Sequence, residues 1–265
     1  MKVEIGVSLD ATLGCGQAHR WRKQPDGSWQ GVLGTDVVTM SSIEGGIEVT
    51  GCDDRKVILD YFRCDDDFDG IMEDISSRDA YVGELVGRCP GLRILRQDRW
   101  ECLATYLLAT NANVARIGGM VESVCDTFGR DLGGRHSFPT PSEILDRPER
   151  ISACRLGYRD ERLVKLAERT ESGAIDLDAI AEYDYGMCTE VLCDIEGVGP
   201  KVADCVALFA FDHLEAFPVD ARISKVMDLK YGVTGSYRKV ADKGRELFGP
   251  YAGYAQEFLY HSAFI

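Results

Sequence analysis

The segment from residue 192 to residue 204 constrains the fold of this chain more than any other. It reads Leu-Cys-Asp-Ile-Glu-Gly-Val-Gly-Pro-Lys-Val-Ala-Asp, so one helical pattern ends, two glycines flank a valine, and a second helical pattern begins. Glycine lets a backbone adopt positive φ and approach a ligand closely. Because the N–H groups at a helix start form an anion site, the segment predicts two helices joined by a hairpin that binds phosphate through Gly197 and Gly199.

The first 63 residues differ in pattern from the rest of the chain. Short β-rich segments alternate there with turn residues, and Asp26-Gly27 and Gly45-Gly46 are hairpin signals. We therefore expect a small antiparallel β-sheet lobe over residues 1–63. The expected strands are Val3–Ser8, Trp29–Leu33, Val37–Met40, Ile47–Thr50 and Lys56–Phe62.

From residue 64 onward the apolar residues recur with a helical period. Asp98 and Thr140 stand where helix caps belong, each with a glutamate three positions later. We expect an all-α body over residues 64–265 that carries the active-site cleft, which makes the fold class α+β. The expected helices include 102–108, 113–128, 160–170, 176–183, 186–194, 200–210, 221–229, 236–247 and 253–263.

Composition limits the cellular setting and the cofactors. The chain has no apolar run of the roughly 20 residues that cross a bilayer, and its start lacks the features of a signal peptide. Its ten cysteines are spread singly, as in a reducing compartment, and none forms the CxxC pair of a zinc ribbon or an iron–sulfur cluster. We expect an intracellular protein without membrane contact, cytoplasmic and nucleoid-associated, or nuclear in a eukaryote.

The formal net charge of −14 is unusual for a nucleic-acid partner, since phosphate contacts call for a basic surface. A few arginines and helix dipoles can still form a positive strip on an acidic body. The charge therefore does not exclude DNA.

A second pattern follows the hairpin. Phe217-Pro218-Val219-Asp220 ends 19 positions after Lys201 and precedes the helical run 221–226. Capping that helix is one function open to Asp220. A glycine hairpin followed by Pro-Val-Asp at this interval is also the signature of the helix–hairpin–helix DNA glycosylase superfamily, which the chain resembles.

Within that superfamily the chain resembles the 8-oxoguanine DNA glycosylase/lyase family over nearly its whole length. The resemblance implies a bifunctional enzyme of base excision repair that excises 8-oxoguanine opposite cytosine and cuts the strand by β-elimination. It implies double-stranded DNA containing an oxidised purine as the partner, and we expect no cofactor and a monomer. The matching runs are Gly14–Trp21, Arg96–Leu103, Thr110–Ile117, Gly119–Glu122, Leu156–Arg159, Gly199–Cys205 and Ala252–Gln256.

The resemblance implies that Lys201 and Asp220 are catalytic. The neutral amine of Lys201 would attack C1′ of the deoxyribose, expel the base and leave a Schiff base. Burial and the positive end of its helix would lower the pKa of Lys201, while Asp220 would oppose that shift and stabilise the cationic sugar. The alternative for Lys201 is a solvated lysine in the first turn of a helix.

The base pocket implied by the resemblance consists of Gly16, Cys205, Gln256 and Tyr260. The carbonyl of Gly16 would accept N7–H of 8-oxoguanine and repel the N7 lone pair of guanine. Gln256 would bind the Watson–Crick edge, while Cys205 and Tyr260 would sandwich the ring. Spacing alone puts Cys205 on the helical face of Lys201. Tyr260 replaces the phenylalanine usual in the family; a turn residue and plain core residues are the alternatives.

The resemblance also assigns residues to the base opposite the lesion, which is orphaned when the damaged base flips out. Asn111, Arg116 and Arg159 would hydrogen-bond that cytosine, and Tyr158 would be the wedge beside it. Ala112 replaces an asparagine of the relatives, so one polar contact is in doubt. An asparagine-rich helix junction is the alternative at 111–113.

Gly197, Gly199 and Arg222 complete the expected DNA contacts. Arg222 stands where the family commonly has histidine, and arginine can still bind phosphate. No catalytic metal is expected, but relatives hold a monovalent cation on hairpin carbonyls. The corresponding carbonyls here belong to Cys193, Ile195 and Val198.

Two other functions stay open. A glycosylase of the same superfamily could act on another damaged base, although an alkylated-purine enzyme would lack a lysine at the hairpin. An endonuclease III-type enzyme would usually carry a four-cysteine cluster, and no cysteine follows Cys205. A non-catalytic DNA-binding module would need neither Asp220 nor a base pocket.

Overall fold

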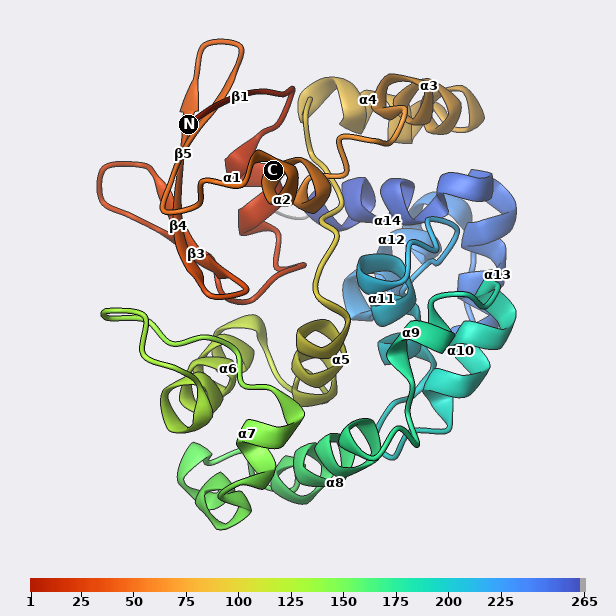
Figure 1. The fold of residues 1–265 in the computed structure, drawn as a ribbon. Coiled ribbons are helices and arrows are strands. Elements are labelled where there is room, and N and C mark those ends of the chain that lie inside the picture. The colour runs from red at the N-terminus through yellow and green to blue at the C-terminus, as the bar shows by residue number, and fades with distance from the viewer. Residues whose placement is uncertain (263–265) are drawn as a thin grey trace.

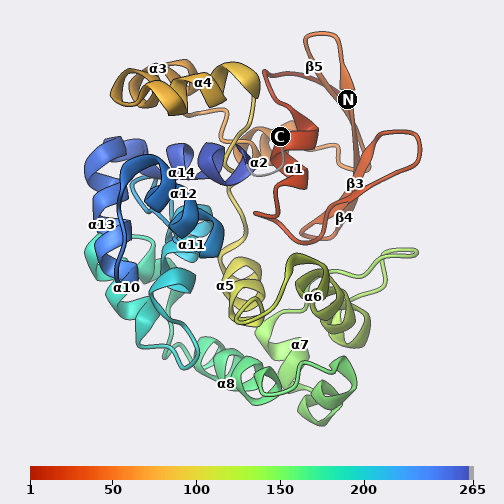
Figure 2. The same ribbon diagram turned by 180° about the vertical axis from the view of Figure 1, so that it is seen from behind.

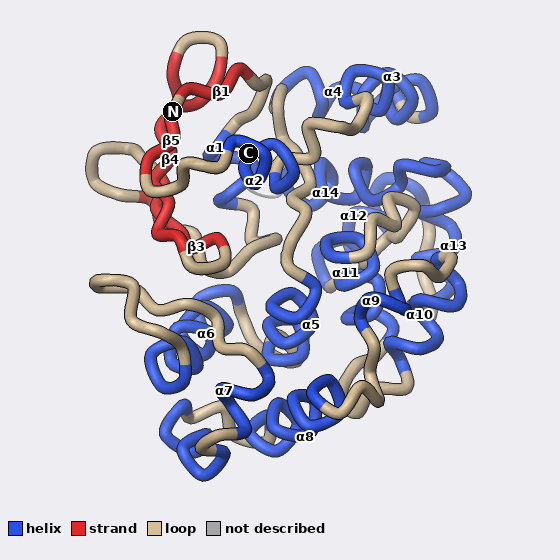
Figure 3. Tube along the Cα trace, viewed as in Figure 1, coloured by secondary structure: helices blue, strands red, loops and turns tan. Residues whose placement is uncertain are grey.

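The computed structural model describes residues 1–262, in which an N-terminal β-sheet adjoins a larger set of helices (Figure 1). The sheet is antiparallel, has five strands and runs in the order β1-β5-β4-β3-β2. Strands among the described residues are confined to the first fifty positions (Figure 3). Their bounds are Lys2–Glu4 for β1, Arg22–Lys23 for β2, Trp29–Leu33 for β3, Asp36–Ile43 for β4 and Gly46–Thr50 for β5.

Two tight turns set the register of the sheet. Strands β2 and β3 pair Lys23 with Trp29 around Asp26-Gly27, and β4 and β5 pair Ile43 with Gly46. Gly27 and Gly45 have φ of +87° and +75°, values that L side chains rarely adopt. Both hairpin signals in the sequence are therefore confirmed.

Two short helices cover the buried face of the sheet. Alternate strand residues such as Met40 and Val49 are fully buried, and they share a core with Leu13 of α1 (Leu9–Gly14) and Ile58 of α2 (Arg55–Tyr61). Figures 1 and 2 show both helices between the sheet and the rest of the molecule.

The strand predicted at Lys56–Phe62 is wrong. The Asp54 carboxylate accepts a hydrogen bond from Lys56 N at 2.8 Å and starts helix α2. Ile58, Tyr61 and Phe62 then recur at helical spacing and are buried together. The apolar and β-branched composition resembled a strand, but the cap and the period specify a helix.

The strand predicted at Val3–Ser8 is too long. Pairing with β5 ends at Glu4, and Ser8 Oγ accepts Ala11 N at 3.3 Å as the cap of α1. Helix α1, which the sequence analysis did not predict, then buries Leu9 and Leu13 against the sheet.

The remaining helices curve around α5 and α11, which lie in contact near the centre (Figure 1). The expected caps Asp98 and Thr140 are confirmed, since each side chain accepts a backbone N–H of its helix. The bounds are α3 Phe68–Arg78, α4 Ala80–Arg88, α5 Arg99–Leu108, α6 Val114–Phe128, α7 Pro141–Leu145, η1 Pro148–Cys154, α8 Arg159–Glu171, α9 Leu177–Ile180, α10 Tyr185–Cys193, α11 Pro200–Ala210, α12 Ala221–Tyr231, α13 Tyr237–Phe248, η2 Gly249–Tyr251 and α14 Ala252–His261.

Buried arginines hold the sheet region against the helices. Arg63 is 1% exposed, and its Nη2 lies 3.2 Å from the Leu208 carbonyl and 2.6 Å from Asp212 Oδ1. Arg93 donates to the carbonyls of Gly6 and Phe62. These contacts fix the N-terminal sheet region relative to α11. The sheet region and α11 both contribute residues to the site described next. Among residues 1–262, no helix has the length and apolar character to span a membrane.

Candidate active site

A cavity of about 720 Å³ opens where the loop before β2 meets α5, α11, α12 and α14. The segments that line it come from both ends of the chain, which the fold brings together. The predicted residues on its wall are Lys201, Asp220, Gly16, Cys205, Gln256, Tyr260, Asn111, Gly197, Gly199 and Arg222.

Helix α11 begins at this cavity with an open N-terminus. Its N-cap is Gly199, which has no side chain, and Pro200 occupies the first turn. Gly197 has φ of +93°, and a Cβ there would lie 2.9 Å from Leu107 Cδ1, so only glycine fits the turn. The hairpin predicted from the sequence is confirmed. One of its carbonyls, that of Ile195, accepts Val198 N at 2.9 Å, and the cation on this hairpin stays a prediction.

Helix α12 begins at the same cavity with its N-terminus capped. Asp220 Oδ1 accepts hydrogen bonds from Arg222 N at 2.9 Å and from Ile223 N at 2.8 Å. The capping interpretation of Asp220 is thus correct, and the cap also sets the carboxylate on the cavity wall. The two functions are compatible because the second carboxylate oxygen takes no part in these hydrogen bonds.

Lys201 is half-buried in the first turn of α11, with Nζ 5.5 Å from the centroid of the Tyr106 ring. Its pKa is raised, first by attraction to Cys205, with burial acting against the rise and Asp220 and Glu257 adding to it. The expected lowering is therefore wrong for the DNA-free protein. Burial does favour the neutral amine, but the surrounding anionic groups outweigh it.

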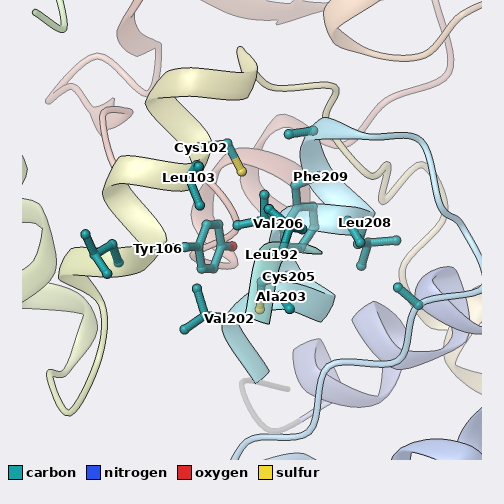
Figure 4. Packing of buried hydrophobic residues seen from close by; sticks show 14 of the residues in the cluster. Cys102, Leu103, Tyr106, Leu192, Val202, Ala203, Cys205, Val206, Leu208 and Phe209 are labelled. Atoms are coloured by element: carbon teal, nitrogen blue, oxygen red, sulfur yellow. The ribbon is translucent and has the colours of Figure 1, made fainter. Parts of the chain in front are cut away.

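Cys205 lies one helical turn from Lys201 and is buried. Burial raises the pKa of its thiol to about 11, so it is uncharged at neutral pH and attracts the ammonium only in alkaline solution. Figure 4 shows Cys205 on α11 near Tyr106 of α5. The Tyr106 ring stacks on Phe209, with centroids 5.7 Å apart and planes 17° apart. This packing forms a rigid wall of the cavity.

Gly16 lies on the opposite side, in a loop held by buried hydrogen bonds. Its φ is +96°, so the backbone conformation itself favours glycine. The side chain of Gln17 donates to the Arg93 carbonyl at 2.9 Å and accepts Leu95 N at 2.8 Å. Tyr106 Oη donates to the Gln17 carbonyl at 3.1 Å. No sequence pattern predicted a function for Gln17 or Tyr106, although Gln17 lies in the matching run Gly14–Trp21.

Gln256 and Tyr260 come from α14. Gln256 is 4% exposed, and its Oε1 has no hydrogen-bond partner within the described part of the chain, although the side chain lines the cavity. An amide in that state is available to a ligand. The guanidinium of Arg222 lies 5.0 Å from the centroid of the half-buried Tyr260 ring. Burial raises the pKa of Tyr260 to about 12.

Asn111, Tyr158 and Arg159 form a cluster around the Thr110 carbonyl. Asn111 has φ of +54° and donates to Tyr158 Oη at 3.4 Å, and both Tyr158 Oη and Arg159 Nη2 donate to that carbonyl. The Tyr158 ring is 51% exposed and lies 4.3 Å from the Arg159 guanidinium. The structure thus brings together three of the four residues predicted for the opposite base. Arg116 is exposed in the first turn of α6 and does not line the cavity.

Two ionisable residues of the cavity were missed. Both ring nitrogens of His19 lack hydrogen-bond partners among the described residues, and burial, followed by the charge of Lys201, lowers its pKa to about 4. Glu257 is 4% exposed, and burial raises its pKa to about 7. The sequence held a signal for each of them. His19 lies in the matching run Gly14–Trp21, where no function was predicted for it, and Glu257 is a charged residue in an apolar helix, directly after Gln256.

Known proteins share both the sequence and the arrangement of these elements. Residues 2–103 match the family described as 8-oxoguanine DNA glycosylase, N-terminal domain. The N-glycosylase/DNA lyase OGG1 of Arabidopsis thaliana is 30% identical, over 96% of this chain and 76% of the plant protein. The apo-form of Clostridium acetobutylicum 8-oxoguanine glycosylase/lyase is 29% identical with a TM-score of 0.92, over 97% of this chain and 94% of that chain.

The clostridial enzyme has also been solved in complex with double-stranded DNA containing cytosine opposite 8-oxoG. That structure is 28% identical with a TM-score of 0.91, over 99% of this chain and 96% of the other. The likeness therefore includes the sheet, the glycine hairpin and the helices that meet at the cavity. Because the chain has the glycine hairpin and is 30% identical to the plant protein over 96% of its own length, it belongs to the 8-oxoguanine DNA glycosylase family.

Proposed function

We infer that the protein is a bifunctional 8-oxoguanine DNA glycosylase/lyase of base excision repair. One observation carries the inference: Lys201 and Asp220 begin two different helices at the wall of a single cavity, which also presents an unpaired amide from Gln256. A module that only gripped DNA would have no use for a nucleophile, a carboxylate and a base-sized cavity at one point.

Lys201 is the nucleophile and Asp220 the electrostatic partner in this proposal. The neutral amine attacks C1′, the base leaves, and ring opening gives a Schiff base from which β-elimination breaks the strand. Asp220 keeps its negative charge at the start of α12 and stabilises the cationic sugar as it forms. The half-buried position of Lys201 above the Tyr106 ring supports this proposal.

Gly16, Cys205, Gln256 and Tyr260 select the damaged base. The Gly16 carbonyl accepts N7–H, which 8-oxoguanine has and guanine lacks. Gln256 binds the Watson–Crick edge with its unpaired amide. Cys205 and Tyr260 lie on either side of the ring. The positive φ of Gly16 and its immobilised neighbour Gln17 support a fixed carbonyl as the discriminating group.

The other predicted residues bind the rest of the duplex. Tyr158 wedges into the helix while Asn111, Arg159 and, from the first turn of α6, Arg116 bind the orphaned cytosine. Gly197, Gly199 and Arg222 bind the phosphate backbone. The sheet lobe over 1–63 and the helical body over 64–265 clamp the DNA together. The protein acts as a monomer, in the cytoplasm at the nucleoid or in the nucleus of a eukaryote.

Incubation with a duplex carrying one 8-oxoguanine opposite cytosine, with and without borohydride, tests this function. We expect a cut strand and, with borohydride, a covalent adduct. Lys201→Gln is expected to lose both while keeping duplex affinity. If the wild-type protein binds that duplex but yields neither product, a panel of other lesions decides between another glycosylase and a binding module.

A further inference from the structure

Glu257 is a buried carboxylate of the cavity that the mechanism above does not use. It lies in α14 directly after Gln256, is 4% exposed, and lines the cavity with Lys201 and Asp220. Within residues 1–262 the cavity wall holds two carboxylates, those of Asp220 and Glu257. A buried carboxylate beside a lysine nucleophile needs a physical account, because burial of a charge is costly.

The two carboxylates have opposite surroundings. Asp220 receives two backbone N–H donors at the start of α12, which hold its carboxylate in place. Glu257 sits within α14, where its hydrogen-bonding neighbour is the Cys15 thiol beside Gly16, and burial outweighs that contact and the pull of Lys201. Its pKa of about 7 means that Glu257 exchanges a proton near neutral pH. Two carboxylates whose environments separate them in this way commonly divide the acid–base work of a site.

Lys201 must lose a proton before it attacks, and its raised pKa makes that loss unfavourable in the free protein. Asp220 is the other carboxylate facing the cavity, and its Oδ1 already accepts two backbone N–H groups at the start of α12. The remaining groups are poor acceptors at neutral pH. His19 has a pKa of about 4, and Cys205, Tyr106 and Tyr260 are protonated neutral groups with raised pKa values. The titratable and charged groups that share the cavity wall with Glu257 or contact it are Cys15, His19, Tyr106, Lys201, Cys205, Asp220, Arg222, Tyr237 and Tyr260.

Resting on the function proposed above, we propose that Glu257 is the proton acceptor of Lys201. An N–H bond of the ammonium breaks, an O–H bond forms on the carboxylate, and the electron pair stays on Nζ. A cation and an anion thereby become two neutral groups, which bound DNA favours by excluding water from the cavity. When the base leaves with the electron pair of its glycosidic bond, the Glu257 carboxylic acid returns the proton to it.

The test measures single-turnover excision of 8-oxoguanine from about pH 5 to about pH 9 in wild type and Glu257→Gln. Glu257 accepts a proton only as the carboxylate. We therefore expect the wild-type rate to rise with pH along an acidic limb centred near the pKa of Glu257. In the variant we expect a loss of about 10²-fold at about pH 8 and no such limb. Duplex affinity is measured in parallel and is expected to be retained, which shows that the variant is folded.

Glu101→Gln is the matched control. Burial also raises the pKa of Glu101 to about 7, but this residue lines a second cavity, of about 790 Å³, and not the first. We expect the acidic limb to persist in that variant. A second variant, Glu257→Ala, opens space for formate, and added formate is expected to restore much of the rate in Glu257→Ala but to leave Glu101→Ala unchanged.

The outcomes separate this inference from the proposed function. If the wild-type protein excises 8-oxoguanine and forms the borohydride-trapped adduct, but Glu257→Gln keeps the acidic limb of the pH profile, only the function assigned to Glu257 is overturned. A second result also overturns the assignment: Glu257→Ala loses rate and formate does not restore it, while Glu257→Gln keeps the acidic limb at a lower overall rate. Glu257 would then have a structural function only. Wild-type protein that neither excises nor traps overturns both.

Discussion

Helices α11 and α12 begin side by side at the same cavity, yet their first turns are built in opposite ways. Helix α11 starts at Gly199 and Pro200, with no side-chain cap from the described residues. Helix α12 starts at Asp220, whose carboxylate accepts two of the free N–H groups. Both starts carry the partial positive charge of a helix dipole. In α12 the fixed Asp220 carboxylate neutralises that partial charge. In α11 the partial charge stays available to a bound anion.

The difference explains how one site can hold an anion and develop a cation. The open end of α11 suits a phosphate oxygen, because no side chain within residues 1–262 caps its N–H groups. The capped end of α12 presents a negative charge where the sugar becomes positive, and the cap holds that charge in place. Glu257, on the same cavity wall, has no such support at a helix start, and burial raises its pKa to about 7.

Replacing Asp220 tests this contrast between the two helix starts most strongly, because it has the largest expected effect on excision. Asparagine caps a helix about as well as aspartate, so Asp220→Asn removes the charge and keeps the start of α12. We expect excision to fall by roughly 10³-fold while the free energy of unfolding stays nearly constant. Asp220→Ala loses the cap as well and costs about 1 kcal/mol of stability in addition.

Single-turnover kinetics and urea unfolding of the two variants separate charge from capping. Full activity in Asp220→Asn would contradict the electrostatic function, and equal stability of both variants would contradict the cap.

Glu257 provides the next test, through the pH dependence of stability. Its pKa rises from 4.5 in the unfolded chain to about 7 in the folded protein. The folded state therefore binds more protons between these values, so the stabilising contribution is present below about pH 4.5 and lost as the pH rises to about 7. Glu257→Gln does not titrate. We expect its free energy of unfolding, relative to wild type, to increase by about 3 kcal/mol between these two pH values.

Urea unfolding of both proteins at about pH 4.5 and about pH 8 measures this change. A difference that does not vary with pH would mean that Glu257 titrates normally in the folded protein.

The hairpin itself gives a smaller effect. Gly197 has φ of +93°, and its Cβ would lie 2.9 Å from both Arg162 Cδ and Leu107 Cδ1. Gly197→Ala is expected to cost about 2–3 kcal/mol through backbone strain and displaced side chains. Gly157→Ala is the control, because Gly157 also has positive φ, +68°, but no atom within 4 Å of its Cβ. It should cost about 1 kcal/mol. Equal thermal shifts in the two variants would show that the clash at the hairpin relaxes freely.

The sequence predicted local features of the site well, because they depend on neighbours in the chain. The glycine hairpin, the caps Asp98 and Thr140, and the turns of the sheet are all specified within a few residues. The helix at Arg55–Tyr61 was missed because β-branched and aromatic residues outweighed a cap at Asp54 that could have been recognised.

The charge state of the site could not be predicted in the same way. The pKa of Lys201 is raised first by Cys205, one turn away on α11, and then by Asp220 and Glu257. These two carboxylates approach from α12 and α14, and no spacing along the chain reveals that they converge. The helix dipole and burial were the local effects visible in the sequence, and both favour the neutral amine. Cys205 on the same helix, together with the carboxylates from α12 and α14, reversed the sign. The same reasoning applies to His19, whose burial in the cavity wall depends on where the loop before β2 lies; its ring has no hydrogen-bond partner within residues 1–262.

The substitution with the smallest expected effect adds a side-chain cap to the open start of α11. Gly199 has φ of −98° and no atom within 4 Å of a Cβ, so a side chain can be added without strain. Gly199→Asp would cap α11 much as Asp220 caps α12, which we expect to stabilise the protein by about 0.5 kcal/mol. The same carboxylate would repel a phosphate, so duplex affinity should fall by about tenfold, or about 1.4 kcal/mol.

Gly199→Ser distinguishes charge from occupancy at this position. Serine caps the helix without a negative charge, so its duplex affinity should lie between those of Gly199→Asp and wild type. Fluorescence anisotropy at two salt concentrations measures the affinities, and the loss in Gly199→Asp should shrink as salt screens the charge. Unchanged affinity in both variants would mean that the uncapped helix end does not bind phosphate, and the contrast between the two helix starts would then concern stability alone.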